Sequence, residues 1–313
     1  MKKTLCAVVV ILFFITLDVY GGVIGTYPRK AMFIEKMVYS PDGKKVALQA
    51  RDKANYYRRN AFVYIGSSRN GRFKKLSNVP VSNISWIDNK TIAFREKGTS
   101  IFVKRSAPAI VVKAIDIKTR RLETLYTLPS QTIPGSGGQT AVTNYYAISP
   151  GARFLLVQIG KQYILEDMAG RRAINLPGFK VPYSSNPVSQ VRFFGRDGIV
   201  LFDGNARRYL VYRFNGRRLR LQKTITSMGR LKPSGNFSID DGGKFIIFST
   251  EVCRGGCRNE IYRYNLRTNR LSRKIMTVRG SQVLRLVFSK QQNQVLVNDF
   301  HRWLKRYPLS TRN

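Results

Sequence analysis

Arginine recurs along this chain in a pattern suited to binding anions. The planar guanidinium of Arg can donate two parallel hydrogen bonds to carboxylate or phosphate oxygens, which the point charge of Lys cannot do. The chain carries 55 Lys and Arg against 17 Asp and Glu, a formal net charge of +38. A charge of this size attracts polyanions in general, and a proteome that is basic throughout would also explain it. The predicted anion-binding residues are the arginines at the start of recurring short strands: Arg72, Arg121, Arg172, Arg218 and Arg270.

Other reactive side chains are sparse. Cys253 and Cys257 form a closely spaced pair, and a disulfide between them is predicted because the chain carries an export signal. His301 is the single histidine, and a lone histidine is more often structural than catalytic. The sequence contains no serine nucleophile elbow and no cluster of metal-ligating residues. We therefore predict no catalytic residue, no cofactor and no metal.

The first residues read as a targeting segment. Lys2 and Lys3 precede an apolar run from Leu5 to Leu17, and Val19–Gly21 offers a small-residue cleavage site. The apolar run is shorter than the roughly 20 residues that a transmembrane helix needs. We predict a signal peptide over 1–21 and a single mature domain over 22–313. The expected location is therefore the periplasm or the outside of the cell.

The elements that would position the arginines are β-hairpins. The stretch SPDGKKVAL from Ser40 places an Asp-Gly turn between two apolar runs, which is a strong hairpin signal. The same shape returns five more times, beginning at Trp86, Ser149, Phe194, Asp240 and Ser289. A hairpin repeated every roughly 40–50 residues is typical of a propeller blade. We predict an all-β fold, a six-bladed β-propeller.

The last blade lacks an outer strand. The stretch from Ile24 to Ile34 belongs to no blade, so we expect it to supply that strand and close the ring. A long insertion spans 128–145 and is either a functional loop or a tolerated one. It and the connection Glu251–Glu260 are the expected recognition loops. The long connections lie on the face of the predicted propeller opposite the arginines. Aromatic residues in or beside these connections are candidate partner contacts: Tyr56, Tyr57, Tyr145, Tyr146, Tyr183 and Phe300.

The motif Ser40-Pro41-Asp42-Gly43-Lys44, with the apolar strand after it, resembles the TolB-type β-propeller repeat. Ser149-Pro150 and the stretch Asp240–Lys244 keep parts of this pattern. The resemblance extends over nearly all of the mature chain. It implies a propeller without the N-terminal domain of TolB and without a hydrolase domain.

These observations favour a non-enzymatic binding or scaffold protein of the bacterial periplasm or cell envelope. We expect a monomer that recognises a protein or peptide through loops at the channel face, and export argues against nucleic acid as the partner. Two alternatives stay open. One is a hydrolase or lyase acting on an anionic glycan at the channel mouth. The other is a protein that binds lipopolysaccharide, anionic lipid or another polyanion through a basic face.

Overall fold

The computed structural model describes residues 23–26, 31–52, 60–68, 72–96, 110–128, 143–159, 162–175, 191–240, 242–253, 257–272, 274–279, 283–289, 294–299 and 303–308. Antiparallel strands dominate these residues, with one short 3-10 helix, η2 (Pro150–Ala152). Within the same ranges, no helix has the length and apolar character needed to cross a membrane.

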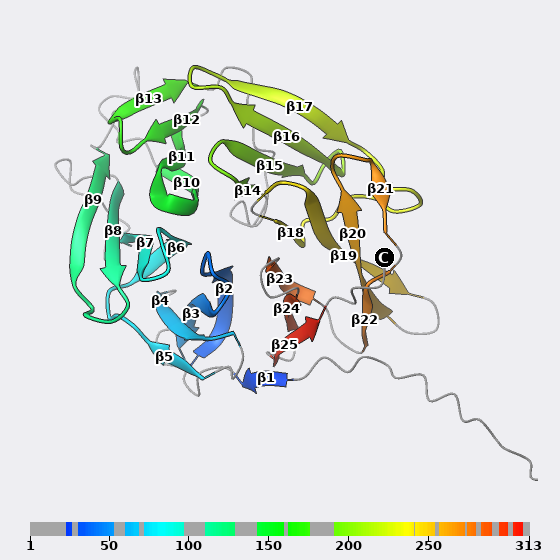
Figure 1. Ribbon diagram of the computed structural model, residues 1–313, viewed down its shortest axis with the longest axis horizontal. Coiled ribbons are helices and arrows are strands. Elements are labelled where there is room, and N and C mark those ends of the chain that lie inside the picture. Colours follow the sequence, from blue (N-terminus) through cyan, green and yellow to red (C-terminus); the bar gives the residue numbers. More distant parts are fainter. Residues whose placement is uncertain are drawn as a thin grey trace, which may run out of the picture.

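The strands form groups of four that follow one another around a common centre (Figure 1). The innermost strands are β2 (Ala31–Tyr39), β6 (Val81–Trp86), β10 (Thr143–Ile148), β14 (Val191–Phe194), β18 (Phe237–Ile239) and β23 (Val283–Ser289). The second strands are β3 (Lys45–Asp52), β7 (Thr91–Glu96), β11 (Phe154–Ile159), β15 (Gly198–Asp203), β19 (Phe245–Cys253) and β24 (Gln294–Asp299).

The third strands are β4 (Ala61–Ser67), β8 (Ile110–Asp116), β12 (Gln162–Asp167), β16 (Arg208–Phe214), β20 (Cys257–Asn265) and β25 (Trp303–Pro308). The outer strands are β5 (Phe73–Lys75), β9 (Leu122–Leu128), β13 (Arg172–Asn175), β17 (Leu219–Ile225), the pair β21 (Arg270–Leu271) and β22 (Met276–Arg279), and β1 (Val23–Thr26). The first two groups are joined into one sheet by a single bridge between Ala61 and Val81.

Each repeated hairpin of the sequence joins the first and second strands of one group. In the first, the Ser40 hydroxyl accepts a hydrogen bond from the Lys45 backbone N–H (2.9 Å) and donates one to Asp42 (2.6 Å). Gly43 has φ of 68°, which glycine adopts without the steric cost that a Cβ brings. The Ser149 hydroxyl accepts in the same way from Phe154 N–H (2.8 Å). The serine of the repeat motif therefore holds the start of the following strand through a side-chain hydrogen bond.

Among the described residues, six apolar clusters lie between neighbouring groups and form the core. In one of them, Phe154 and Leu156 of β11 pack with Ile199 and Leu201 of β15. In another, Leu296 of the last group packs with residues of the first group, including Ile34, Leu48 and Phe62. The last group therefore packs on the first. The number of blades and the closure of the whole ring stay predictions.

The N-terminal strand differs from the expected one. Among the described residues of the N-terminal stretch, Val23–Thr26 pairs with β25, at the edge of the last group. Residues Ala31–Ile34, which we expected in the same strand, begin β2 and pair with β3. The reason is burial, because Ile34 is 1% exposed within the core of the first group, whereas an added outer strand would leave it near the rim.

A further expectation was wrong in the fifth group. The connection Glu251–Glu260 is not a long loop, because β19 and β20 stay paired up to Cys253 opposite Cys257. The outer strand is broken into β21 and β22, which pair with different parts of β20. Lys274 lies in the segment between them, where its ammonium reaches Glu260 on β20.

Candidate functional site: a basic face and a central cavity

All five predicted arginines lie at the turn between the third and outer strands of their groups, and all are exposed. Asp116 shows how the turn is made: its carboxylate accepts hydrogen bonds from Lys118 N–H (2.8 Å) and Thr119 N–H (2.7 Å). These bonds lower the pKa of Asp116, the bond from Thr119 most. Arg120 then adopts a left-handed φ of 61°, and Arg121 leads into β9.

An Asp or Asn cap recurs in three more groups, in turns of the same length at Asp167 and Asn265 and in a turn two residues shorter at Asn215. Asp167 accepts from Gly170 N–H, Asn215 from Arg217 and Arg218 N–H, and Asn265 from Arg267 and Thr268 N–H. A residue with positive φ follows each cap: Arg171, Gly216 and Asn269. In each of these four groups the arginine lies opposite the capping residue at the start of the outer strand, so it occupies an equivalent place.

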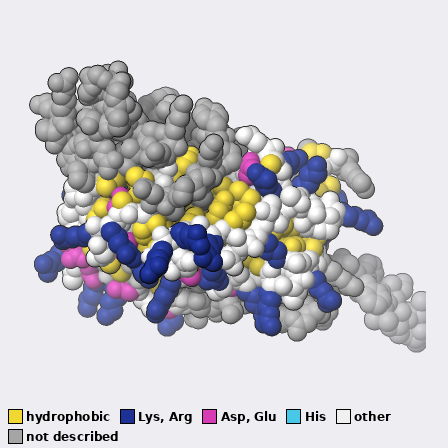
Figure 2. Space-filling view, turned by 90° about the horizontal axis from the view of Figure 1, so that it is seen from above, with side chains coloured by type: hydrophobic (Ala, Val, Ile, Leu, Met, Phe, Trp, Pro, Cys, Tyr) yellow, Lys and Arg dark blue, Asp and Glu magenta, His cyan; other side chains and the backbone are white. Residues whose placement is uncertain are grey.

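The turns between first and second strands lie beside these arginine turns. Met168 N–H donates to the Arg153 carbonyl (2.9 Å), Ile117 N–H to Lys90 (2.8 Å), and Leu266 N–H to Lys244 (2.9 Å). Both sets of cations therefore share one face. Figure 2 shows many Lys and Arg side chains along the lower part of the view, with others at the upper right. We call this surface the basic face: Arg72, Arg121, Arg172, Arg218, Arg270, Lys44, Lys45, Lys90, Arg153, Arg196 and Lys244.

A cavity of about 240 Å³ lies at the centre of the molecule. Residues of all the innermost strands, or of the turns directly after them, line it. Pro41, Pro150 and Gly151 belong to turns on the side of the basic face, so the cavity extends to that side. Its aromatic lining is Tyr39, Trp86, Phe193 and Phe288.

Two cations from different strands line this cavity. Lys36 of β2 is half-buried, and its ammonium donates to Asn83 Oδ1 (2.6 Å). Removal of water, and after it the nearby charge of Arg192 on β14, together lower the pKa of Lys36 to about 7. Asn83 is 1% exposed and has a φ of 57°, and its N–H donates to Gln49 Oε1 (2.6 Å).

Glu35 is the single acidic side chain among the described residues that line the cavity. Arg51 Nε donates to Glu35 Oε1 (2.5 Å), and Gln49 Nε2 donates to Glu35 Oε2 (2.5 Å). Both carboxylate oxygens are thus already hydrogen-bonded to residues of β3. The described charged residues of the lining are therefore two cations, Lys36 and Arg192, and one carboxylate, Glu35.

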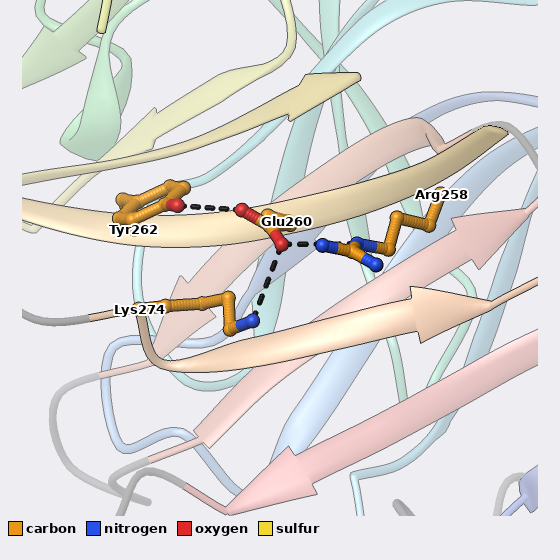
Figure 3. Close-up of polar contacts among 4 residues, drawn as sticks. All are labelled: Arg258, Glu260, Tyr262 and Lys274. Carbon is orange, nitrogen blue, oxygen red and sulfur yellow. Dashed lines mark hydrogen bonds and ion pairs between the residues drawn. The ribbon is translucent and has the colours of Figure 1, made fainter. Parts of the chain in front are cut away.

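Buried carboxylates with tyrosine partners occur away from the cavity. Glu260 on β20 accepts from Tyr262 OH (2.6 Å), Arg258 Nε (3.1 Å) and Lys274 Nζ (3.2 Å), as Figure 3 shows. Loss of water and the carboxylate together raise the pKa of Tyr262 to about 12. β19 separates β20 from the innermost strand, so this cluster does not reach the cavity.

A similar pair links two groups. Tyr126 OH on β9 donates to Glu166 on β12 (2.8 Å), and Glu166 is 2% exposed. Loss of water, with this hydrogen bond second, raises the pKa of Tyr126 to about 12. Both carboxylates serve as hydrogen-bond acceptors inside or between groups.

Several predicted site residues cannot be placed. Tyr56, Tyr57, Tyr183, Phe300 and His301 lie outside the described residues. So do Lys290, residues 129–142 of the long insertion and residues 254–256 of the Cys253–Cys257 connection. Tyr145 and Tyr146 lie on β10, where the backbone alone is described. The register of β19 and β20 places Cys253 opposite Cys257, which suits a disulfide, and the bond stays a prediction. No group of three or more His, Cys, Asp or Glu suited to a metal occurs among the described residues.

The sequence reasoning missed Lys36, Arg192 and Asn83. A charged residue inside an apolar innermost strand was the available signal, as in VRFF around Arg192. In a half-buried strand, where apolar and polar residues alternate, such a residue is expected on the solvent-exposed side.

No protein-family model matches the chain, and no curated protein matches it. Among solved structures, it is similar to the β-propeller domain of Cps50 (Swd1) from Myceliophteria thermophila, with a TM-score of 0.53 and 11% identity over 88% of this chain and 84% of that one. TolB from Acinetobacter baumannii is similar with a TM-score of 0.48 and 12% identity, over 88% of this chain and 78% of that one. A functionally unknown protein from Desulfotomaculum acetoxidans matches with a TM-score of 0.49 and 11% identity, over 89% and 83%.

The chain is a β-propeller. The prediction of an all-β propeller is confirmed by the strand arrangement and by the likeness to the Cps50 domain. At these identities the likeness concerns the fold alone.

Proposed function

We propose that this protein is a non-enzymatic binding protein whose basic face recognises an acidic segment of a protein or peptide partner. One observation carries the proposal: an exposed arginine at the turn between the third and outer strands lies beside the turn between the first and second strands, group after group. Equivalent arginines around a centre present guanidinium forks to successive carboxylates of an acidic chain.

The distribution of acidic groups supports a binding role over a glycan-cleaving one. Cleavage of a glycosidic bond uses two carboxylates on either side of the bond. Glu35 is held by Arg51 and Gln49, and Glu260 and Glu166 lie away from the cavity with their own partners. The described part of the cavity thus offers cations and aromatic surface.

We also propose that the protein is exported, with a signal peptide over 1–21, and that its repeat is of the TolB type. Lys2, Lys3 and the apolar run after them support export. The intact mass of protein recovered from the cell envelope tests the cleavage after Gly21, and a full-length mass contradicts it.

Two variants of equal net charge test the basic face. The first carries Arg121→Gln, Arg172→Gln and Arg218→Gln. The control carries Arg207→Gln, Arg230→Gln and Lys232→Gln, three exposed positions in connections at the other end of the strands. Each exposed pair contributes about 0.2–1 kcal/mol, so three lost pairs weaken binding of an acidic peptide by about tenfold.

Binding of a labelled oligo-glutamate peptide is measured at about 0.15 M salt, where the Debye length of about 8 Å screens diffuse attraction. We expect the control to bind within about twofold of the parent protein, because total charge alone contributes little under these conditions. Equal weakening of both variants contradicts a site on the basic face. Binding to anionic phospholipid vesicles but not to the peptide would instead favour the lipid-binding alternative and overturn the proposal.

A further inference from the structure

The central cavity combines positive charge with aromatic surface. Lys36 and Arg192 approach it from β2 and β14, strands of different groups, and Tyr39, Trp86, Phe193 and Phe288 form much of its wall. We propose that this cavity binds a small organic acid with an apolar or aromatic body, its carboxylate lying between Lys36 and Arg192. The proposal does not rest on the function of the basic face, because none of its residues belongs to that face.

The electrostatics of the cavity favour a carboxylate. Two like charges close together in a space with little water destabilise each other, and a bound anion relieves this repulsion. Arg192 acts on Lys36 in this way, since its charge disfavours the protonated amine. Glu35 is hydrogen-bonded through both carboxylate oxygens to Arg51 and Gln49.

Lys36 is held in place before any ligand arrives. Its hydrogen bond to Asn83 fixes the ammonium, and Asn83 is fixed by its own bond to Gln49. Arg192 is half-buried, lies over the ring of Phe237 (5.2 Å to the centroid) and donates to the Val191 carbonyl (2.9 Å). Cations positioned in advance lose little conformational freedom when a ligand binds, which favours affinity.

The size of the cavity selects a small ligand. An apolar cavity of about 150 Å³ holds one benzene molecule. A cavity of about 240 Å³ therefore has room for one aromatic ring with a short acid chain. Trp86 is positioned to pack against such a ring, because its indole N–H is held by the Val38 carbonyl (3.1 Å) and its side chain is otherwise buried.

Proton linkage follows from the state of Lys36. With a pKa of about 7, the amine of the free protein is charged below neutral pH and loses its charge as the pH rises above 7. A bound carboxylate favours the charged amine, so affinity decreases as the pH rises, and binding at pH 8 takes up a proton. The charged groups that face Lys36 or its partners are Arg192, Arg51 and the salt-bridged Glu35.

Calorimetric titration with phenylacetate tests the site. Phenylacetamide serves as the neutral analogue, acetate as a carboxylate that lacks the aromatic ring, and inorganic phosphate as an inorganic anion. The variants are Lys36→Met and Arg192→Met, with Lys36→Gln as a milder replacement should Lys36→Met fail to fold. The control is Lys90→Met, an exposed cation of the basic face.

We expect saturable binding of phenylacetate with quenching of Trp86 fluorescence, and at least about tenfold weaker binding of the amide, acetate and phosphate. A factor of ten corresponds to about 1.4 kcal/mol, within the range for a hydrogen bond to a charged group. Lys36→Met and Arg192→Met each lose at least tenfold, and Lys90→Met loses nothing. Titration at pH 8 in buffers of different ionisation enthalpy shows proton uptake that disappears in the Lys36 variants. Equal binding of acid and amide, stronger binding of phosphate, no saturable binding, or unchanged affinity in folded Lys36 and Arg192 variants would each overturn the proposal.

Discussion

The buried Glu260 cluster gives a quantitative prediction of pH-dependent stability. In Glu260→Gln the shape is kept and the negative charge is lost. Glu260 is 6% exposed, and its three donors are Tyr262 OH (2.6 Å), Arg258 Nε (3.1 Å) and Lys274 Nζ (3.2 Å) (Figure 3). The change makes the bond from Tyr262 a neutral one, removes the opposite charge from the bonds of Arg258 and Lys274, and turns one amide N–H₂ toward an existing donor.

The expected loss is about 2 kcal/mol at pH 7. A hydrogen bond to a charged group contributes about 1.5–3 kcal/mol and a neutral one about 0.5–1.5, so the bond from Tyr262 alone loses about 1 kcal/mol. Arg258 and Lys274 are 44% and 42% exposed, and water can replace much of what they lose, so together they add about 1 kcal/mol.

The difference between the two proteins should vanish in acid. The hydrogen bond from Tyr262 and the two cations hold the pKa of Glu260 below its usual value. A lowered pKa in the folded state means that the carboxylate stabilises the fold above its ordinary pKa of about 4.3, and that this stability is lost as the pH falls through the lowered folded pKa. Below that value the parent protein carries a neutral Glu260 and resembles the Gln variant.

Urea unfolding at pH 7 and at the lowest pH where the parent stays folded measures this difference. The matched control is Glu123→Gln on β9, an exposed carboxylate, which should change the free energy of unfolding by less than about 0.5 kcal/mol at either pH. A Glu260→Gln variant as stable as the parent at pH 7, or one whose deficit persists unchanged in acid, would show that the carboxylate charge does not stabilise this cluster.

Two further predictions concern the repeat turns and the core. Ser40 is 2% exposed, and Ser40→Ala removes the acceptor of the Lys45 N–H, so this variant should lower the free energy of unfolding by about 1–2 kcal/mol. The control Ser227→Ala, at an exposed position, should leave the free energy of unfolding unchanged. Equal urea midpoints for the two variants contradict a stabilising role of the Ser40 hydrogen bond. Gly198→Ala would place a Cβ 2.3 Å from the ring of buried Phe194 and should lower the free energy of unfolding by about 1–3 kcal/mol. The double variant with Phe194→Leu should lose less stability than the sum of the two single variants. Strict additivity of the unfolding free energies contradicts the proposed steric conflict.

The sequence alone determined the hairpin repeat and the place of the arginines. Both depend on residues a few positions apart: Ser40 clamps Lys45 across five residues, and Asp116 caps a turn that ends at Arg121. Hydrogen bonds within a turn need no tertiary contact, so such turns can be predicted from the sequence and recur wherever the motif recurs. The all-β propeller and the five exposed arginine positions were predictable for this reason.

Strand extent and the central cavity were decided by tertiary structure. Ala31–Ile34 joins β2 because the core of the first group buries Ile34, and β19 and β20 run to Cys253 and Cys257 because their pairing continues past the residues that looked like a loop. Lys36, Asn83 and Arg192 come from three strands far apart in the chain and meet only where the innermost strands converge. Strand alternation tells which residues share a side of one strand, but the convergence of strands around the centre decides which of those residues line a cavity, and no local pattern records it.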